Sequence, residues 1–372
     1  MITELKLQNF KCFGDETSFK FSRFNVLYGK NGRGKSTAIQ SLLLLGQNVR
    51  IKDSFINNLS LKGAYIDLGN YKDVTNRYNG VEAPIRFEVA SDVDNVLKLT
   101  FGASEVGPTM IHLEDAWSGD THLVSSVGTE LEDSEETRNS SAMSGIRILE
   151  TFKQLRYVAA GRRGPINYEE RYDDFTKDDI GASGERLINA LAKCTKPFID
   201  DFQYALSFIL SGATVKLSED NNVDHIDLLL DSCDESVGFK PSNVGFGYSF
   251  VMPIVYQILS AERDTTVIIE NPEAHLYPGA QSRLVEWMVG IANNKNLQVI
   301  LETHSDHIIN GLRISVKQGK LNRNDVMIQF VDRGNSIKTP SVQIIKIDQN
   351  GTLSNNPTDF MDEWTKQLLE LL

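Results

Sequence analysis

The sequence is poor in cysteine and holds no long apolar run. Its three cysteines, Cys12, Cys194 and Cys233, lie far apart and lack C-x-x-C spacing, which excludes a disulfide framework and a zinc-ligand set. No apolar stretch approaches the roughly 20 residues that a membrane-spanning helix requires, and residues 1–7 are too polar for a signal peptide. These absences predict a cytoplasmic protein with reduced thiols and no membrane contact.

Positive charge is also scarce. Lysine and arginine together number 38 against 50 aspartates and glutamates, so the formal net charge is −12 at pH 7. This balance argues against a protein that coats nucleic acid by bulk electrostatics, although an acidic molecule can still carry a local basic groove. The chain shows no internal repeat and no heptad array, which excludes a long coiled coil. A hydrophobic content of 41% over 372 residues is ample for one elaborated domain or two lobes.

Residues 29–37, with the sequence GKNGRGKST, form a complete G-x-x-x-x-G-K-[ST] phosphate-binding motif. Its glycines let backbone N–H groups turn toward phosphates where side chains would block the approach, Lys35 supplies charge, and Ser36 offers a hydroxyl to Mg²⁺. Residues 24–28 predict a buried strand before the motif and residues 37–45 a helix after it, the order that the motif requires, which disfavours a chance match. The chain is therefore predicted to bind a nucleoside triphosphate through Gly29, Asn31, Gly32, Gly34, Lys35, Ser36 and Thr37.

Strand-like patterns surround this motif. Residues 2–28 alternate apolar and polar positions and predict two strands that lead into the phosphate loop. Residues 85–89 and 96–101 show the same alternation, and they predict an antiparallel sheet attached to the nucleotide site.

The middle of the chain contains an acidic stretch followed by a stretch with helical spacing. Residues 113–145 are rich in Ser, Glu, Asp, Thr and Gly, and they predict a mobile acidic loop, interpreted as a solvated insertion rather than a partner-binding tail. Residues 184–210 show the spacing of amphipathic helices broken by Pro197. Together with residues 241–261 they are expected to form a helical subdomain.

Two further strands end in polar residues. Residues 266–270 predict an apolar strand that ends at Glu270, and Glu273 follows three positions later. Phosphoryl transfer needs one carboxylate to hold Mg²⁺ and another to orient the attacking water, and this spacing fits both roles. Residues 297–302 predict a strand followed by His304, which can reach a γ-phosphate. One alternative is that the two glutamates only start a surface helix, and the phosphate loop makes it weaker. The other is an ordinary surface histidine, which is weaker because His304 follows a third parallel-type strand at the same sheet edge.

Two other clusters are less specific. Ser242, Gly245 and Gly247 precede an apolar stretch and predict an anion-binding helix start, although a G-x-G pattern alone is weak evidence. Arg162 and Arg163 lie in a predicted loop. They are equally compatible with reaching the nucleotide or DNA across an interface and with simple solvation.

These elements, in this order, resemble the ABC-type ATPase heads of the SMC, RecF and OLD group, especially compact bacterial AAA-family ATPases of anti-phage defence systems. The likeness covers nearly the whole chain. Its motifs are the opening strand and turn at residues 9–13, Walker A at 29–37, a signature position at 242–249, Walker B at 270–278 and a histidine switch at 303–305.

The resemblance implies an α/β fold, namely a P-loop NTPase of ABC-ATPase type with an attached antiparallel β region and a helical subdomain. Residues 1–372 would form a single head. Within it, residues 1–70 would be the Walker A lobe, residues 71–240 a β and helical insertion, and residues 241–372 the lobe with the signature, Walker B and histidine switch.

The resemblance also implies Mg²⁺-dependent ATP hydrolysis. Ser36 and Glu270 would hold Mg²⁺, Glu273 would be the catalytic base and His304 the γ-phosphate sensor. The signature of a second subunit, with Ser242, Gly245 and Gly247, would close over the ATP.

The sequence departs from the family pattern at several places. Glu270 replaces the commoner aspartate, and the sequence SNVGFG at residues 242–247 replaces the usual LSGG. The glutamine of the family's Q-loop cannot be assigned, because the candidates Gln40 and Gln47 lie in or just after the first predicted helix.

Two functional hypotheses follow. In the first, a homodimer or higher oligomer forms around ATP and controls a separate effector, a nuclease or toxin, in anti-phage defence. In the second, a RecF-like or SMC-like repair ATPase clamps DNA directly. A membrane transporter motor is a distant third. The stretch after His304 is too short for the nuclease domain that OLD proteins carry there, so any cleavage is expected from another polypeptide.

Overall fold

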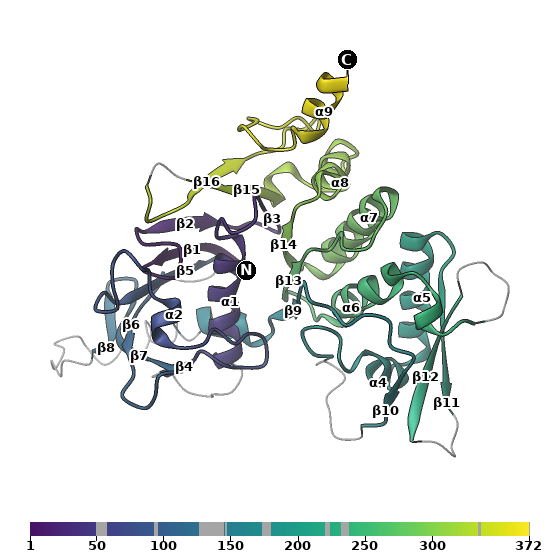
Figure 1. Cartoon of the computed structure of the whole chain (residues 1–372), viewed down its shortest axis with the longest axis horizontal. Helices are drawn as coiled ribbons and strands as arrows, with labels where there is room; N and C mark the ends of the chain where they lie inside the picture. Colours follow the sequence, from purple (N-terminus) through teal and green to yellow (C-terminus); the bar gives the residue numbers. More distant parts are fainter. Residues whose placement is uncertain are drawn as a thin grey trace. The chain divides into compact units, whose positions relative to one another are not determined.

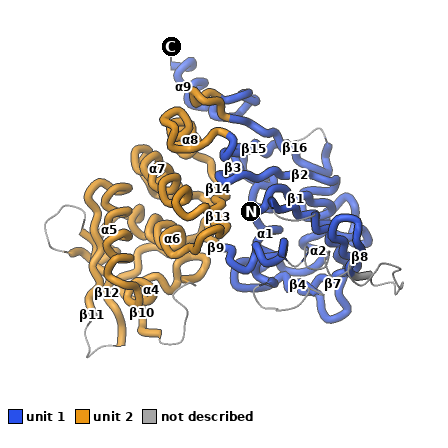
Figure 2. The backbone as a smooth tube through the Cα atoms, turned by 180° about the vertical axis from the view of Figure 1, so that it is seen from behind, with its two compact units in different colours: residues 1–155, 324–346, 353–372 blue, residues 156–323, 347–352 orange. Residues whose placement is uncertain are grey.

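The computed structural model describes residues 1–49, 58–92, 96–125, 145, 147–172, 180–219, 224–231, 238–333 and 336–371. These residues form two compact units, coloured separately in Figure 2. Unit 1 contains residues 1–155, 324–346 and 353–372, and unit 2 contains residues 156–323 and 347–352. The expected lobe boundaries at residues 70 and 240 stay predictions.

Unit 1 contains an antiparallel sheet of seven described strands. Their order is β2-β1-β5-β6-β7-β4, and β8 also pairs with β7. Phenylalanine rings line its buried face, with centroids 5.2 Å apart for Phe10 and Phe87 and 5.8 Å apart for Phe87 and Phe101. The predicted antiparallel sheet is confirmed. Its strands are β1 (Ile2–Gln8), β2 (Thr17–Lys20), β4 (Asn58–Ser60), β5 (Ile85–Ser91), β6 (Leu97–Ala103), β7 (Met110–Ser118) and β8 (Thr121–Ser125).

The expected acidic loop does not begin at residue 113, because β7 and β8 form a hairpin there. Leu113 and Ala116 are buried, Trp117 stacks on His122, and Asp115 accepts hydrogen bonds from Trp117 and His122. The acidic residues were misleading because Asp115 serves this hairpin rather than a solvated segment. Residues 126–144 of the expected loop lie outside the described residues.

The phosphate motif lies between β3 (Phe24–Tyr28) and α1 (Lys35–Val49), as predicted. Within unit 1, β3 runs parallel to β15 (Val326–Asp332), and β15 pairs antiparallel with β16 (Ser341–Ile345). Residues 147–153 are helical. The described part of the unit also contains the helices α2 (Tyr71–Val74) and α9 (Glu363–Leu371).

Unit 2 is built on three parallel strands. β13 (Thr266–Glu270) lies between β14 (Gln298–Thr303) and β9 (Arg156–Val158). All six residues of β14 and the first four of β13 are buried, as expected for parallel strands with both faces covered. Both strand predictions are therefore confirmed.

In Figure 1, helices lie beside these strands, and a small three-stranded sheet lies beyond those helices. α6 contacts β9 and β13, α5 contacts α6 and α7, and α7 contacts α8. Pro197 lies in the first turn of α5, which confirms the predicted helix break. The helices are α4 (Leu187–Ala192), α5 (Lys196–Leu210), α6 (Phe246–Ser260), α7 (Pro278–Lys295), α8 (Asp306–Lys317) and the 3-10 turns Pro241–Asn243 and Arg323–Asp325. The sheet has the order β10 (Tyr168–Glu170), β12 (His225–Asp231), β11 (Thr214–Glu219).

No helix among the described residues combines the length and the apolarity that a bilayer span requires.

Candidate nucleotide site

The phosphate loop depends on glycine at two positions. Gly29 and Gly34 have φ values of 143° and 107°, which side chains rarely adopt. A Cβ atom at Gly29 would lie 2.1 Å from the carbonyl oxygen of Val331, and one at Gly34 would lie 2.7 Å from Cζ of Phe13. Around Gly32, by contrast, nothing lies within 4 Å of that position. The loop is thus a cradle of bare backbone beside β15.

Lys35 begins α1 and is 3% exposed. Its Nζ donates hydrogen bonds to the carbonyl oxygens of Gly29 and Lys30, both at 2.9 Å. Phosphate oxygens are charged and accept stronger hydrogen bonds from an ammonium group than carbonyl oxygens do. The bare cradle and the enclosed ammonium group therefore fit the phosphates of a nucleotide, and the exposed Ser36 lies at the same helix start.

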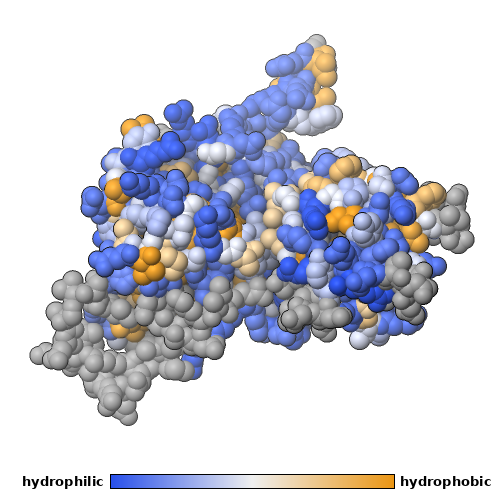
Figure 3. Space-filling model, turned by 60° about the horizontal axis from the view of Figure 1, so that its bottom comes forward, coloured by the Kyte–Doolittle hydropathy of each residue, from blue (hydrophilic) through white to orange (hydrophobic). Residues whose placement is uncertain are grey.

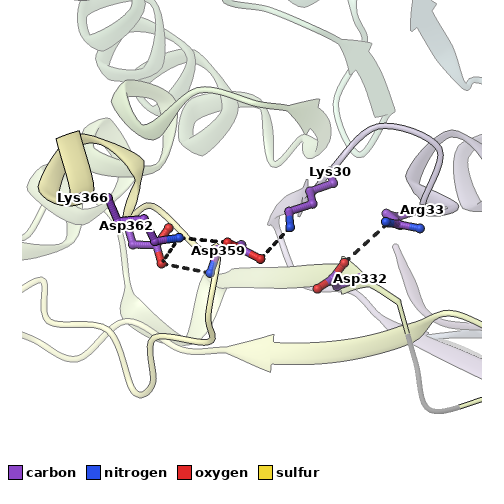
Figure 4. A network of polar contacts seen from close by, with 6 residues as sticks. All are labelled: Lys30, Arg33, Asp332, Asp359, Asp362 and Lys366. Carbon is purple, nitrogen blue, oxygen red and sulfur yellow. Dashed lines mark hydrogen bonds and ion pairs between the residues drawn. The ribbon is translucent and has the colours of Figure 1, made fainter. Parts of the chain in front are cut away.

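Two other cations of the loop form ion pairs within unit 1 (Figure 4). Lys30 Nζ lies 2.6 Å from a carboxylate oxygen of Asp359, and Arg33 Nε lies 3.6 Å from Asp332 at the end of β15. Asp359 also binds Lys366 at 2.9 Å. The segment before α9 thus braces the phosphate loop, which no motif in the sequence indicated.

The segment before α9 also makes apolar contacts with the strands beside the phosphate loop. Phe360 is 2% exposed, and its ring lies 5.1 Å from that of Tyr28 and 5.5 Å from that of Phe330. The following helix α9 has no buried residue. Hydrophobic side chains of α9 are visible at the top of Figure 3, and the exposed ones are Trp364, Leu368, Leu369 and Leu371.

Both candidate Q-loop glutamines form hydrogen bonds with other parts of unit 1. Gln40 accepts a hydrogen bond from Lys11 at 2.6 Å. Gln47 is buried, donates to the carbonyl of Ser60 and accepts from the backbone N–H of Ile66. Gln47 therefore ties α1 to the segment around β4.

Glu270 ends β13 in unit 2 and is held by the segment after β9. The backbone N–H of Ala160 donates to its Oε2 at 3.3 Å, and the hydroxyl of Tyr157 donates to the same carboxylate. Burial raises the pKa of Glu270, while Ala160, Tyr157 and the charge of Arg162 oppose that rise. Burial and the neighbouring Glu270 raise the pKa of Tyr157, so its hydroxyl remains a donor.

Glu273 lies on the loop after β13 and binds the end of β14. Its carboxylate accepts hydrogen bonds from the hydroxyl of Thr303 at 2.7 Å and from the backbone N–H of His304 at 2.8 Å. His304 itself is exposed. Residues 30 positions apart in the sequence are thus brought together, as the shared strand edge predicted, and two hydrogen bonds leave acceptor capacity on the Glu273 carboxylate.

The predicted signature residues have different environments. Gly245 is the N-cap of α6, and nothing lies within 4 Å of its Cβ position. Gly247 lies inside the first turn, where a Cβ would approach the carbonyl oxygen of His275 to 2.9 Å. The backbone N–H of Ser242 donates to Asn167. The expectation that both glycines precede the helix is therefore wrong, because α6 begins at Phe246 and Gly247 allows its close packing.

Arg162 is 4% exposed, whereas Arg163 is exposed. The guanidinium of Arg162 donates to the carbonyl oxygens of Ala159 and Glu270 at 3.0 and 2.7 Å, and to that of Asn271 at 2.5 Å. Simple solvation is therefore excluded for Arg162. The sequence contained the pair of arginines but no sign that one of them enters the interior.

The predicted site residues belong to different units. Residues 29–37 are part of unit 1, whereas Ser242, Glu270, Glu273 and His304 are part of unit 2. Among the described residues, no group of three or more His, Cys, Asp or Glu side chains could hold a metal ion by itself.

Comparison with protein families gives matches along most of the chain. The AAA domain family matches residues 4–193, over half of the chain. The chain belongs to the AAA domain family. A second model, the AAA ATPase domain, matches residues 129–309, and a family of proteins of unknown function matches residues 321–371. No curated protein matches this AAA protein.

Solved structures with a similar fold are SMC heads. The SMC head bound to the C-winged helix domain of ScpA has a TM-score of 0.53 and 12% identity, with 94% of this chain and 98% of that chain covered. The SMC head domain from Thermotoga maritima has a TM-score of 0.50 and 13% identity, with 93% and 99% covered. At such identities the likeness concerns the fold, and it confirms the predicted α/β P-loop class. The protein is an ATPase of AAA type with an SMC-head fold.

Proposed function

We propose that this AAA ATPase is a cytoplasmic protein that dimerises around ATP and thereby controls a separate effector, a nuclease or toxin, in bacterial anti-phage defence. In this proposal Lys35 and the glycine cradle bind the phosphates. Ser36 and Glu270 hold Mg²⁺, which supplies positive charge to the phosphates when bound. Glu273 accepts the proton of the attacking water, and His304 contacts the γ-phosphate.

The start of α6 carries the dimer part of the proposal. Helix N-termini attract anions because their first N–H groups have no partner within the helix. At Gly245 the backbone is open to approach, since a Cβ would meet nothing within 4 Å. The sequence around it occupies the signature position, which in the resembling heads acts on the nucleotide of the opposite subunit. Each site would then be incomplete until two chains meet, so ATP would stabilise the dimer by linkage.

Two observations support a protein effector. A separate protein is bound to one SMC head of this fold, through the C-winged helix domain of ScpA. In addition, α9 exposes Trp364 and three leucines beside Glu363 and Glu370, an apolar and acidic surface. A DNA clamp would need a continuous basic groove, and the net charge of −12 disfavours one.

The decisive experiment uses Glu273→Gln, which is expected to bind ATP without hydrolysing it. The tagged variant is purified from its native host with ATP and Mg²⁺, and its mass is measured by light scattering. We expect a dimer that carries one protein partner in constant ratio and loses it when ATP is removed.

Two results would contradict the proposal. A monomer in saturating ATP would remove the dimer mechanism. A dimer that retains nuclease-sensitive DNA and no protein would favour the RecF-like or SMC-like clamp, the second candidate that the SMC-head fold leaves open. The matched control is Lys35→Ala, which should yield neither a dimer nor a partner.

A further inference from the structure

The chain makes an unusual turn directly after β13. Asn271 has a φ of 45°, in the left-handed region, which asparagine tolerates better than most residues. Its backbone N–H donates to the carbonyl oxygen of Glu302 at 2.7 Å. This turn separates Glu270, at the end of the strand, from Glu273, on the loop. The directions of both carboxylates therefore depend on what holds this turn.

Arg162 holds the turn from the other side. Its planar guanidinium binds the carbonyl oxygens of both Glu270 and Asn271, and it binds Ala159 of its own segment as well. Its Cζ lies 5.3 Å from the centre of the Phe250 ring on α6, and that ring lies 4.4 Å from the ring of His275. Burial lowers the pKa of Arg162 to about 10, so the group stays charged at neutral pH.

We propose that Arg162 is the positioning residue of the catalytic loop. By binding the carbonyl oxygens on either side of the left-handed turn, it sets the directions of Glu270 and Glu273 without touching the substrate. This inference rests on the proposed roles of the two glutamates. Its chemistry needs arginine, because a guanidinium presents several donors in one plane, whereas a lysine ammonium is a point charge that cannot reach three carbonyl groups from the same position.

The test is Arg162→Lys in the full chain, which keeps the charge and most of the length but loses the planar fork. We expect kcat for ATP hydrolysis to fall about 100-fold, because a displacement of catalytic groups near 1 Å has an effect of this size. The KM for ATP should change by no more than about threefold, since the phosphate loop is untouched. Arg163→Lys is the matched control, an exposed neighbour for which kcat should stay within about twofold.

A second variant keeps the proposal testable if Arg162→Lys does not fold. Phe250→Leu removes the ring beneath the guanidinium and retains an apolar side chain, and we expect a fall in kcat of about tenfold with KM unchanged. Folding is checked by the melting temperature and by binding of a nonhydrolysable ATP analogue.

Wild-type kcat in Arg162→Lys would overturn the proposal. A parallel loss of analogue binding, melting temperature and kcat in both variants would overturn it too, because the residue would then only support the fold. As a separate measurement, dimerisation of the wild type is tested with the same nonhydrolysable analogue. Its absence would count against the proposed function and would leave the comparison of kcat between Arg162 and its variants intact.

Discussion

The phosphate loop of unit 1 and the loop after β13 in unit 2 are built in opposite ways. The phosphate loop is contiguous in sequence, and its shape depends on missing side chains, since a Cβ at Gly29 would collide with β15. The loop after β13 depends on side chains from distant segments, which hold Glu270 through Ala160 and Glu273 through Thr303. We therefore expect the phosphate loop to be sensitive to added atoms at Gly29 and Gly34, and the loop after β13 to be sensitive to the loss of these hydrogen bonds.

The largest effect is expected from adding one methyl group to the phosphate loop. Gly29→Ala places a Cβ 2.1 Å from the carbonyl oxygen of Val331 and at a φ of 143°, so we expect loss of ATP binding and a stability decrease of about 2–4 kcal/mol. Calorimetry and chemical denaturation measure both. Gly32→Ala is the control, because no atom lies within 4 Å there and only the backbone strain, about 1 kcal/mol, remains. Equal effects of the two variants would contradict this account of the loop.

Lys35→Ala should abolish measurable ATP binding and leave the chain folded. The ammonium contributes charge-assisted hydrogen bonds to phosphates, and their loss weakens binding by at least about 100-fold. Isothermal calorimetry measures the affinity, and circular dichroism checks the fold. Unchanged ATP affinity would contradict the assignment of residues 29–37 as the phosphate-binding part of the nucleotide site.

Glu273→Gln should slow hydrolysis by at least about 100-fold while ATP binding persists. The amide preserves the shape and can still accept from the backbone N–H of His304, but it does not take up a proton. Single-turnover hydrolysis and analogue binding separate the two steps. If Glu273→Gln hydrolyses ATP normally and Glu270→Gln does not, the proposed roles of the two glutamates are exchanged.

Substitutions at Gly245, the N-cap of α6, and at Gly247, in its first turn, distinguish a role in the dimer interface from a role in packing. Gly245→Leu should leave ATP binding and stability unchanged and prevent ATP-dependent dimerisation, as sedimentation with the nonhydrolysable analogue would show. Gly247→Leu should instead lower stability by about 1–3 kcal/mol, because its side chain would press on the carbonyl of His275. A Gly245→Leu chain that dimerises normally would reduce residues 242–249 to a plain helix start.

The smallest effect is expected at the surface brace of the phosphate loop. Hydrogen bonds from Lys30 and Lys366 lower the pKa of Asp359 to about 2. Their contribution to stability is therefore present above the ordinary carboxyl pKa and is lost as the pH falls through about 2. Lys30→Ala should raise the pKa of Asp359, measured by NMR titration, and leave kcat within about twofold. A large loss of hydrolysis would show that the brace acts on catalysis.

The sequence alone determined the parts that rest on neighbouring residues. The strand, phosphate loop and helix of residues 24–49 follow from an apolar run, glycines that permit left-handed backbone and a helix start, all of them local properties. The strands of residues 266–270 and 298–303 follow from continuous apolar runs in the same way. Local composition failed at residues 113–125, where acidic residues predicted a loop and cross-strand partners make a hairpin.

Only the tertiary structure decided which distant residues hold the phosphate loop and the loop after β13. Arg162 and Glu270 lie 108 positions apart, and Lys30 and Asp359 lie 329 apart, and no motif joins either pair. The close approach of the His275 carbonyl oxygen to Gly247 is likewise a contact between distant segments that the G-x-G pattern does not indicate. Such contacts depend on how separate segments pack, and a periodic pattern within one segment reports only which of its faces is buried. The chemical groups of both loops are therefore set by residues close in sequence, whereas the contacts that hold the loops come from distant parts of the chain.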